Sequence, residues 1–146
     1  MVKPYADYEY YSGIYGGSAI AEGDWLYWAN RACAKVDFLT FGRTARLESA
    51  VLPEDTFAAV QNAVCAVAEI YFRYDTKRAA REVATQHGAM KSESNDGYSV
   101  TYAGAEADDD SSLAASADAE AVEMIGEYLA HTGLMFRGRS RRWDAR

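Results

Sequence analysis

The chain has 146 residues, a mass of 16.1 kDa and 49% hydrophobic residues, which is the size of one ordinary globular domain with enough apolar side chains for a core. Its formal charge of −7 disfavours a protein that wraps nucleic acid, because phosphate binding needs a positively charged surface. Two cysteines and two histidines are too few for a disulfide framework or a self-contained zinc site, so we expect neither.

Residues 1–20 form a tyrosine-rich segment that ends in Gly16-Gly17. Its glycines and mixed polar spacing argue against a helix, so we predict an extended N-terminal arm. Tyrosine offers a large contact area with only two side-chain torsions, which suits an intersubunit contact. The alternative is that the rings pack on the core of their own subunit. The candidate intersubunit residues are Tyr5, Tyr8, Tyr10, Tyr11 and Tyr15.

Hydrophobic periodicity predicts a first helix over about residues 22–40. Apolar side chains from Trp25 to Leu39 recur at intervals of three and four, which describes one buried stripe. Gly42 follows as a helix stop, because glycine accepts the left-handed conformation that ends many helices.

The second predicted helix begins near Pro53, and its apolar face runs from Phe57 to Tyr71. So few polar residues interrupt this helix that we expect it to lie centrally, with neighbours on most sides. Beyond Tyr74 the pattern turns polar, and the basic residues Arg73, Lys77 and Arg81 recur every four positions. This row indicates a solvated continuation of the helix, with a subunit contact as the alternative.

A β-hairpin is expected near residues 90–102. Tyr98, Val100 and Tyr102 alternate with polar residues, and an Asp-Gly turn precedes them. Residues 103–117 are small and acidic and are typical of a linker. A third helix is predicted from about 117 to 131, with Gly133 and then Leu134 as its stop.

The last ten residues form a basic tail. Residues 137–146 hold five arginines and one aspartate, a net charge of +4, whereas the rest of the chain carries 10 basic and 21 acidic side chains, a net −11. An acidic body with a basic tail makes the tail the segment that reaches a partner, and a solvated, disordered terminus is the alternative.

These elements predict a mainly α fold: a small helical bundle of three to four helices with one β-hairpin and extended N- and C-terminal arms. We divide the chain into an arm (1–20), a helical domain (21–136) and the basic tail (137–146).

No catalytic constellation can be assembled from the residues. His87 and His131 are each explained locally, and no P-loop, Cys-X-X-Cys or Gly-X-Ser-X-Gly pattern occurs. We therefore expect no enzymatic activity, no metal site and no cofactor. Neither a secretory signal nor a stretch of about 20 apolar residues is present, so we expect a protein that does not cross a membrane.

The hairpin motif resembles the central motif of the head–tail connector proteins of tailed bacteriophages, also called adaptor or head-completion proteins. Supporting features are Tyr10-Tyr11, Tyr15-Gly16-Gly17, the segment 37–40, and the segment 132–138 near the end. The likeness covers most of residues 8–138. The motif residues are Lys91, Ser92, Glu93, Ser94, Gly97, Tyr98, Val100 and Tyr102.

The resemblance implies a structural role in the virion. Such proteins form a ring, here expected to be a dodecamer, that lies beneath the portal protein, extends the DNA channel and provides the docking platform for a stopper or tail protein. DNA would pass through the lumen without specific binding. The implied location is the neck of the virion, and the host cytoplasm during assembly. In similar adaptors the C-terminal segment docks onto the portal, which here maps onto Phe136, Arg137, Arg139, Arg141, Arg142 and Trp143.

Two alternatives stay open. One is a tail-completion or stopper protein of the same neck. The other is a helical DNA-binding regulator that uses residues 137–146 as a basic arm, although the −11 charge of the body opposes it.

Overall fold

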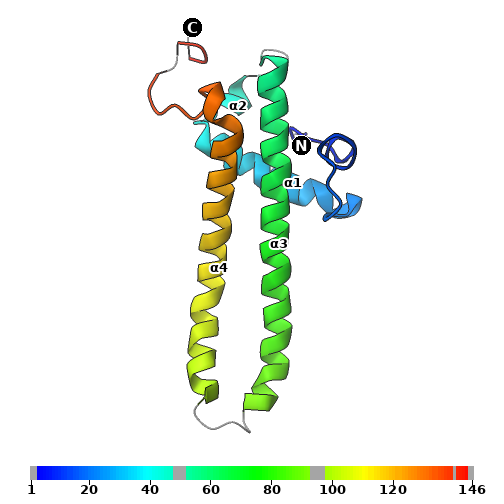
Figure 1. The fold of residues 1–146 in the computed structure, drawn as a ribbon, viewed down its shortest axis with the longest axis vertical. Coiled ribbons are helices and arrows are strands. Elements are labelled where there is room, and N and C mark those ends of the chain that lie inside the picture. The colour runs from blue at the N-terminus through cyan, green and yellow to red at the C-terminus, as the bar shows by residue number, and fades with distance from the viewer. Residues whose placement is uncertain (1–2, 48–51, 93–97, 140, 145–146) are drawn as a thin grey trace.

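Two long antiparallel helices and a shorter helix that crosses them make up the body of the molecule (Figure 1). The structure is a computed structural model that describes residues 3–47, 52–92, 98–139 and 141–144, and the side chains among these except those of residues 85–110. The long helices are α3 (Glu54–Ser92) and α4 (Tyr98–Leu129), and the crossing helix is α1 (Glu22–Leu39). The fold is mainly α, as the periodicity predicts.

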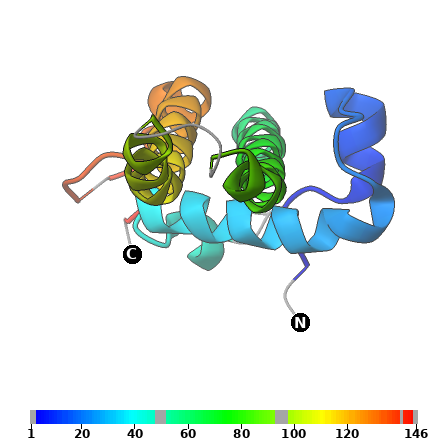
Figure 2. The same cartoon turned by 90° about the horizontal axis from the view of Figure 1, so that it is seen from below.

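Three short helical segments complete the described part of the fold. A π-helical turn, η1 (Tyr10–Tyr15), precedes α1, the single turn α2 (Arg43–Arg46) follows it, and the 3₁₀ turn η2 (Ala130–Thr132) follows α4. Figure 2 shows α1 running across both long helices, with the N-terminal turns beside α3 at one end and the C-terminal tail beside α4 at the other.

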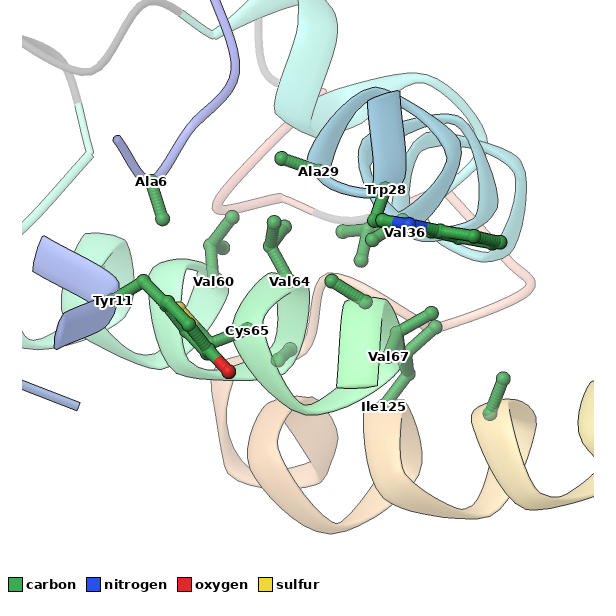
Figure 3. Packing of buried hydrophobic residues seen from close by; sticks show 14 of the residues in the cluster. Ala6, Tyr11, Trp28, Ala29, Val36, Val60, Val64, Cys65, Val67 and Ile125 are labelled. Atoms are coloured by element: carbon green, nitrogen blue, oxygen red, sulfur yellow. The ribbon is translucent and has the colours of Figure 1, made fainter. Parts of the chain in front are cut away.

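The core lies where α1 crosses the first half of α3. Val60, Val64 and Val67 of α3 are fully buried, with Val36 of α1 on one side and Ile125 of α4 on the other (Figure 3). This arrangement confirms that the helix beginning after Pro53 is central. Farther along α3, the basic row Arg73, Lys77 and Arg81 is exposed, as its pattern predicts, and Arg73 also forms an ion pair with Glu120 of α4.

The N-terminal segment is not an extended arm. Asp7 receives a 2.9 Å hydrogen bond on its carboxylate from the backbone N–H of Tyr10, which caps a helical turn, and η1 continues from there. Gly16 ends the turn with a φ of 82°, and the ring of Tyr11 lies so close to Gly17 that a side chain there would collide with it. The two glycines thus serve a tight helical end rather than an extended chain.

The tyrosine rings pack on their own core, which was the alternative to an intersubunit contact. Tyr11 is fully buried, stacks on Trp25 at 4.2 Å between ring centroids, and donates a 2.8 Å hydrogen bond to Glu69. Tyr5 donates to Asp37 at 2.7 Å and Tyr10 to the side-chain oxygen of Asn62 at 2.8 Å. Tyr8 and Tyr15 are partly buried against the same core.

The hairpin expected near residues 90–102 is not observed in the part of the chain that the structure describes. Residues 90–92 form the end of α3 and residues 98–102 the first turns of α4, while Glu93, Ser94 and Gly97 lie outside the described residues. The alternation in Tyr98–Tyr102 extends over only five residues, and the alanine-rich stretches on both sides of the motif favour helix.

Residues 103–117 are also helical, so the predicted linker is wrong. Alanine has the highest helix propensity of all residues, and Ala117 is buried where α4 meets the other helices. A composition of small and acidic residues indicates that a segment is exposed to solvent, but it does not exclude a helix.

No helix in the described ranges is both long and apolar enough to cross a membrane.

Replacing Tyr11 separates the contribution of its hydroxyl from that of its ring. Tyr11→Phe removes the donor to Glu69 and the acceptor for the backbone N–H groups of Ala19 and Ile20, and we expect a loss of about 1–3 kcal/mol in the free energy of unfolding. Tyr11→Ala should cost about 3–5 kcal/mol because it leaves a cavity. Urea denaturation measures both, and Tyr27→Phe, at an exposed ring, serves as the control with a change below about 0.5 kcal/mol.

Alkaline pH should destabilise the fold, because a buried thiol and a buried phenol keep their protons in the folded state at pH values where the unfolded chain loses them. Burial raises the pKa of the Cys65 thiol from its ordinary value near 9 to about 12, and burial also raises the pKa of Tyr11 to about 12. The unfolded chain releases these protons first, so the contribution of these two groups to the free energy of unfolding should be constant below about pH 8 and be lost between about pH 9 and pH 12. Urea denaturation across this range checks it, and Cys65→Ala should show a shallower decline; an equal decline would contradict the role of the thiol.

Candidate docking surface at the C-terminal tail

The C-terminal tail does not hang free but is fastened to the body by Arg43, the first residue of α2. The chain reverses direction ahead of it, because Phe41 and Gly42 both adopt left-handed conformations, with φ of 57° and 72°. This reversal turns the Arg43 side chain, which is only 4% exposed, under the tail. The left-handed glycine expected at Gly42 is therefore present, and Phe41 shares its conformation.

Arg43 binds the tail at several points. One guanidinium nitrogen donates to the carbonyl oxygens of Leu134 and Phe136, at 2.7 and 2.6 Å, and the other donates to the carbonyl of Gly138 at 2.8 Å. The Asp144 carboxylate receives two further hydrogen bonds, 3.2 Å from Nε and 2.8 Å from the terminal nitrogen. We call this set of contacts the Arg43 clasp. A buried guanidinium needs such partners, because an unpaired charge would be costly to remove from water.

Two further contacts hold the ends of the tail. The buried Thr132 hydroxyl donates to the carbonyl of Leu129 and accepts the N–H of Leu134, which fixes the turn at Gly133. Gly133 has the left-handed φ, 76°, expected of the helix stop. Trp143 donates its indole N–H to the carbonyl of Thr132 at 2.9 Å, and a cleft of about 360 Å³ lies between Trp143 and Leu47.

The other tail residues face outward. Phe136 is 59% exposed, and four arginines are exposed: Arg137, Arg139, Arg141 and Arg142. The guanidinium of Arg142 lies 4.7 Å from the centre of the Trp143 ring. Of the six residues predicted to dock a partner, five present their side chains to solvent, and Trp143 is half-buried as an anchor on the body.

Family models, curated proteins and solved structures contain no match to this chain.

The other predicted sites are not joined to the tail. Tyr8 and Tyr11 pack against Trp25 near the start of α1, whereas Tyr5 donates to Asp37 near its end. The intersubunit role of the tyrosines Tyr5 to Tyr15 stays a prediction, and Tyr11, which is fully buried, presents no surface for it. Of the hairpin motif, Lys91 and Ser92 end α3, and Tyr98, Val100 and Tyr102 begin α4. No group of three His, Cys, Asp or Glu side chains that could hold a metal ion occurs among the described residues.

Sequence reasoning does not single out Arg43 or Asp144. The segment Phe41-Gly42-Arg43 predicts only a helix stop, and no neighbouring residue in the sequence distinguishes a buried arginine from a solvated one. The contact between Arg43 and Asp144 joins residues 101 positions apart, so only the fold reveals it.

Removing the guanidinium should release the tail while leaving the helices in place. Arg43→Ala leaves the Asp144 carboxylate without its buried partner, and the tail should undock so that water can reach it. We expect amide hydrogen exchange over residues 134–144 to accelerate about tenfold or more, with the amides of the α1–α3 crossing unchanged.

Two variants test whether the geometry of the clasp matters. Arg43→Lys should restore protection only in part, because lysine keeps the charge but not the planar fork. Arg46→Ala should leave exchange unchanged. Arg46 is exposed, and its ion pair with Asp144, at 3.6 Å, is longer than that of Arg43 and is screened by solvent. Equal protection in wild type and Arg43→Ala would show that the clasp does not hold the tail.

Proposed function

We propose that this protein is a structural component of a phage virion, a head–tail connector that docks onto the portal protein through its C-terminal tail. The observation that carries the proposal is the outward row of four arginines and Phe136, held in place by the Arg43 clasp. Arginine and aromatic side chains are the residues that most often anchor protein interfaces. Because the clasp orders the backbone before binding, less conformational entropy is lost when a partner docks.

The resemblance of residues 8–138 to the connector family supports the same assignment. Copies of the chain would form a ring, twelve-fold by that resemblance, which extends the DNA channel and offers a platform to a stopper or tail protein. The net −11 of the chain outside the tail suits such a channel, since a negative wall repels the phosphate backbone and lets DNA pass. The proposed role is assembly in the neck of the virion, without catalysis.

A second candidate, a DNA-binding regulator, is favoured by the same exposed arginines, because guanidinium groups also bind phosphates. The acidic body opposes it. Affinity for duplex DNA that falls steeply with salt concentration would support this candidate and contradict the connector. A tail-completion or stopper protein would occupy the same neck without touching the portal, so the position of the chain in assembled necks distinguishes it from a connector.

Neutralising the exposed arginines should abolish docking without disturbing the fold. The variant replaces Arg137, Arg139, Arg141 and Arg142 with glutamine and keeps Asp144 and Trp143, so the Arg43 clasp stays intact. We expect wild-type protein to bind DNA-filled, portal-bearing heads and this variant to lose binding by about a hundredfold or more.

A control variant of equal charge separates docking from general attraction. It carries four glutamines at exposed basic positions away from the tail: Lys3, Arg73, Lys77 and Arg81. Co-sedimentation with heads, followed by electron microscopy of the neck, measures both variants. Equal binding by the tail variant and wild type would overturn the tail assignment.

A further inference from the structure

A groove of about 540 Å³ lies where α1 passes over α3 and α4, and residues of all three helices line it. Six of its lining residues are aromatic or aliphatic: Tyr27 of α1, Tyr71 and Tyr74 of α3, and Leu113, Ala114 and Ala117 of α4. The other four are charged: Arg31, Asp75, Arg78 and Asp118. Tyrosine and arginine are among the residues enriched at the centres of protein interfaces.

Arg31 is held in position by aromatic rings. Its guanidinium carbon lies 5.8, 5.4 and 5.2 Å from the ring centres of Tyr27, Trp28 and Tyr71. Trp28 is itself buried, and its ring packs against Phe72. A guanidinium fixed in this way loses little freedom on binding a planar carboxylate.

The charges around Arg31 are already matched to one another. In the groove, Asp75 pairs with Arg78 at 2.8 Å, and Asp118 pairs with Lys35 at 2.6 Å. Within the described part of the chain, Arg31 forms contacts with aromatic rings but no hydrogen bond or ion pair. One unmatched guanidinium fits one carboxylate, whereas a nucleic acid strand would need a row of cations.

The opposite side of α1 presents a matching group. Nine residues at 100° each place Glu22 half a turn from Arg31, on the other side of the helix. Glu22 is exposed and has no ion pair among the described residues. Leu26 lies one turn further on the same side and is 42% exposed. Helix α1 thus carries an acid beside an aliphatic side chain on one side and a guanidinium groove on the other.

We infer that these two sides of α1 bind each other in successive copies of the chain, with the Glu22 carboxylate of one copy on Arg31 of the next and Leu26 against the apolar wall of the groove. Because the two surfaces differ, the contact is heterologous and can repeat around a ring. The opposite charges and the matching apolar parts make a second copy the occupant. The inference rests on the proposed function for the expectation that copies of this chain assemble.

A charge swap within the full chain tests this pairing. R31E and E22R should each weaken self-association about tenfold or more, because each places like charges at the contact. The double variant R31E/E22R re-forms the pair with reversed sign and should restore association to near the wild-type level. Sedimentation velocity over a range of concentrations measures association, and circular dichroism checks that each variant is folded.

Two control variants carry the same charge changes elsewhere. R81E matches R31E on the exposed part of α3, and E123R matches E22R on the exposed face of α4. Both should associate like wild type. Equal association of the single variants and wild type, or a folded double variant that fails to recover, would overturn the pairing.

The result also separates this inference from the proposed function. If the single variants assemble like wild type while the tail variant loses head binding, the groove pairing is wrong and the connector function stands. If the wild-type chain neither self-associates nor binds heads, both are wrong.

Discussion

The structure depends on the enclosure of the first half of α3. The side chains of Val60 and of residues 63–68 are buried on more than one face, so a single neighbouring helix could not cover them. α1 covers one side, α4 another, and the N-terminal segment with Tyr11 a third (Figure 3). The crossing of α1 over the helix pair follows from this requirement. The position of α1 in turn determines where the tail lies and where the groove beside Arg31 forms.

The C-terminal end of α1 shows how a local turn becomes a binding device. Two successive left-handed residues, Phe41 and Gly42, stop the helix and aim Arg43 back toward the end of α4. A buried guanidinium there has to find acceptors, and the tail supplies three carbonyl groups and a carboxylate. The hydrogen-bonding needs of this one side chain, together with the contacts of Thr132 and Trp143, therefore hold the described tail residues in place.

Strong periodicity makes part of this fold predictable. The first helix, the start of α3 and the stop at Gly133 lie where the spacing of apolar residues and glycines places them, because these signals act within a few residues. The packing of the N-terminal turn is not predictable in this way, because Tyr11 donates to Glu69 at a separation of 58 residues.

Weak local signals account for the errors. Alternation over five residues near Tyr98 suggests a strand, and small acidic residues at 103–117 suggest a loop, but both segments lie in α4. Helix propensity of the alanine-rich sequence outweighs these cues. The candidate site was predictable only as a set of exposed basic residues, since its ordering by Arg43 depends on contacts 91 to 101 positions apart.

The Arg43 clasp also separates the acidic residue of the tail from its exposed arginines. Asp144 is the only acidic residue between positions 137 and 146, and it is turned toward the body, where Arg43 neutralises it. The four exposed arginines then face solvent without a carboxylate of the tail among them. A partner approaching the tail meets a more uniformly positive surface than its net charge of +4 would suggest, because the opposing charge is already paired inside. The buried arginine thus contributes to recognition by withdrawing the negative charge from the binding face.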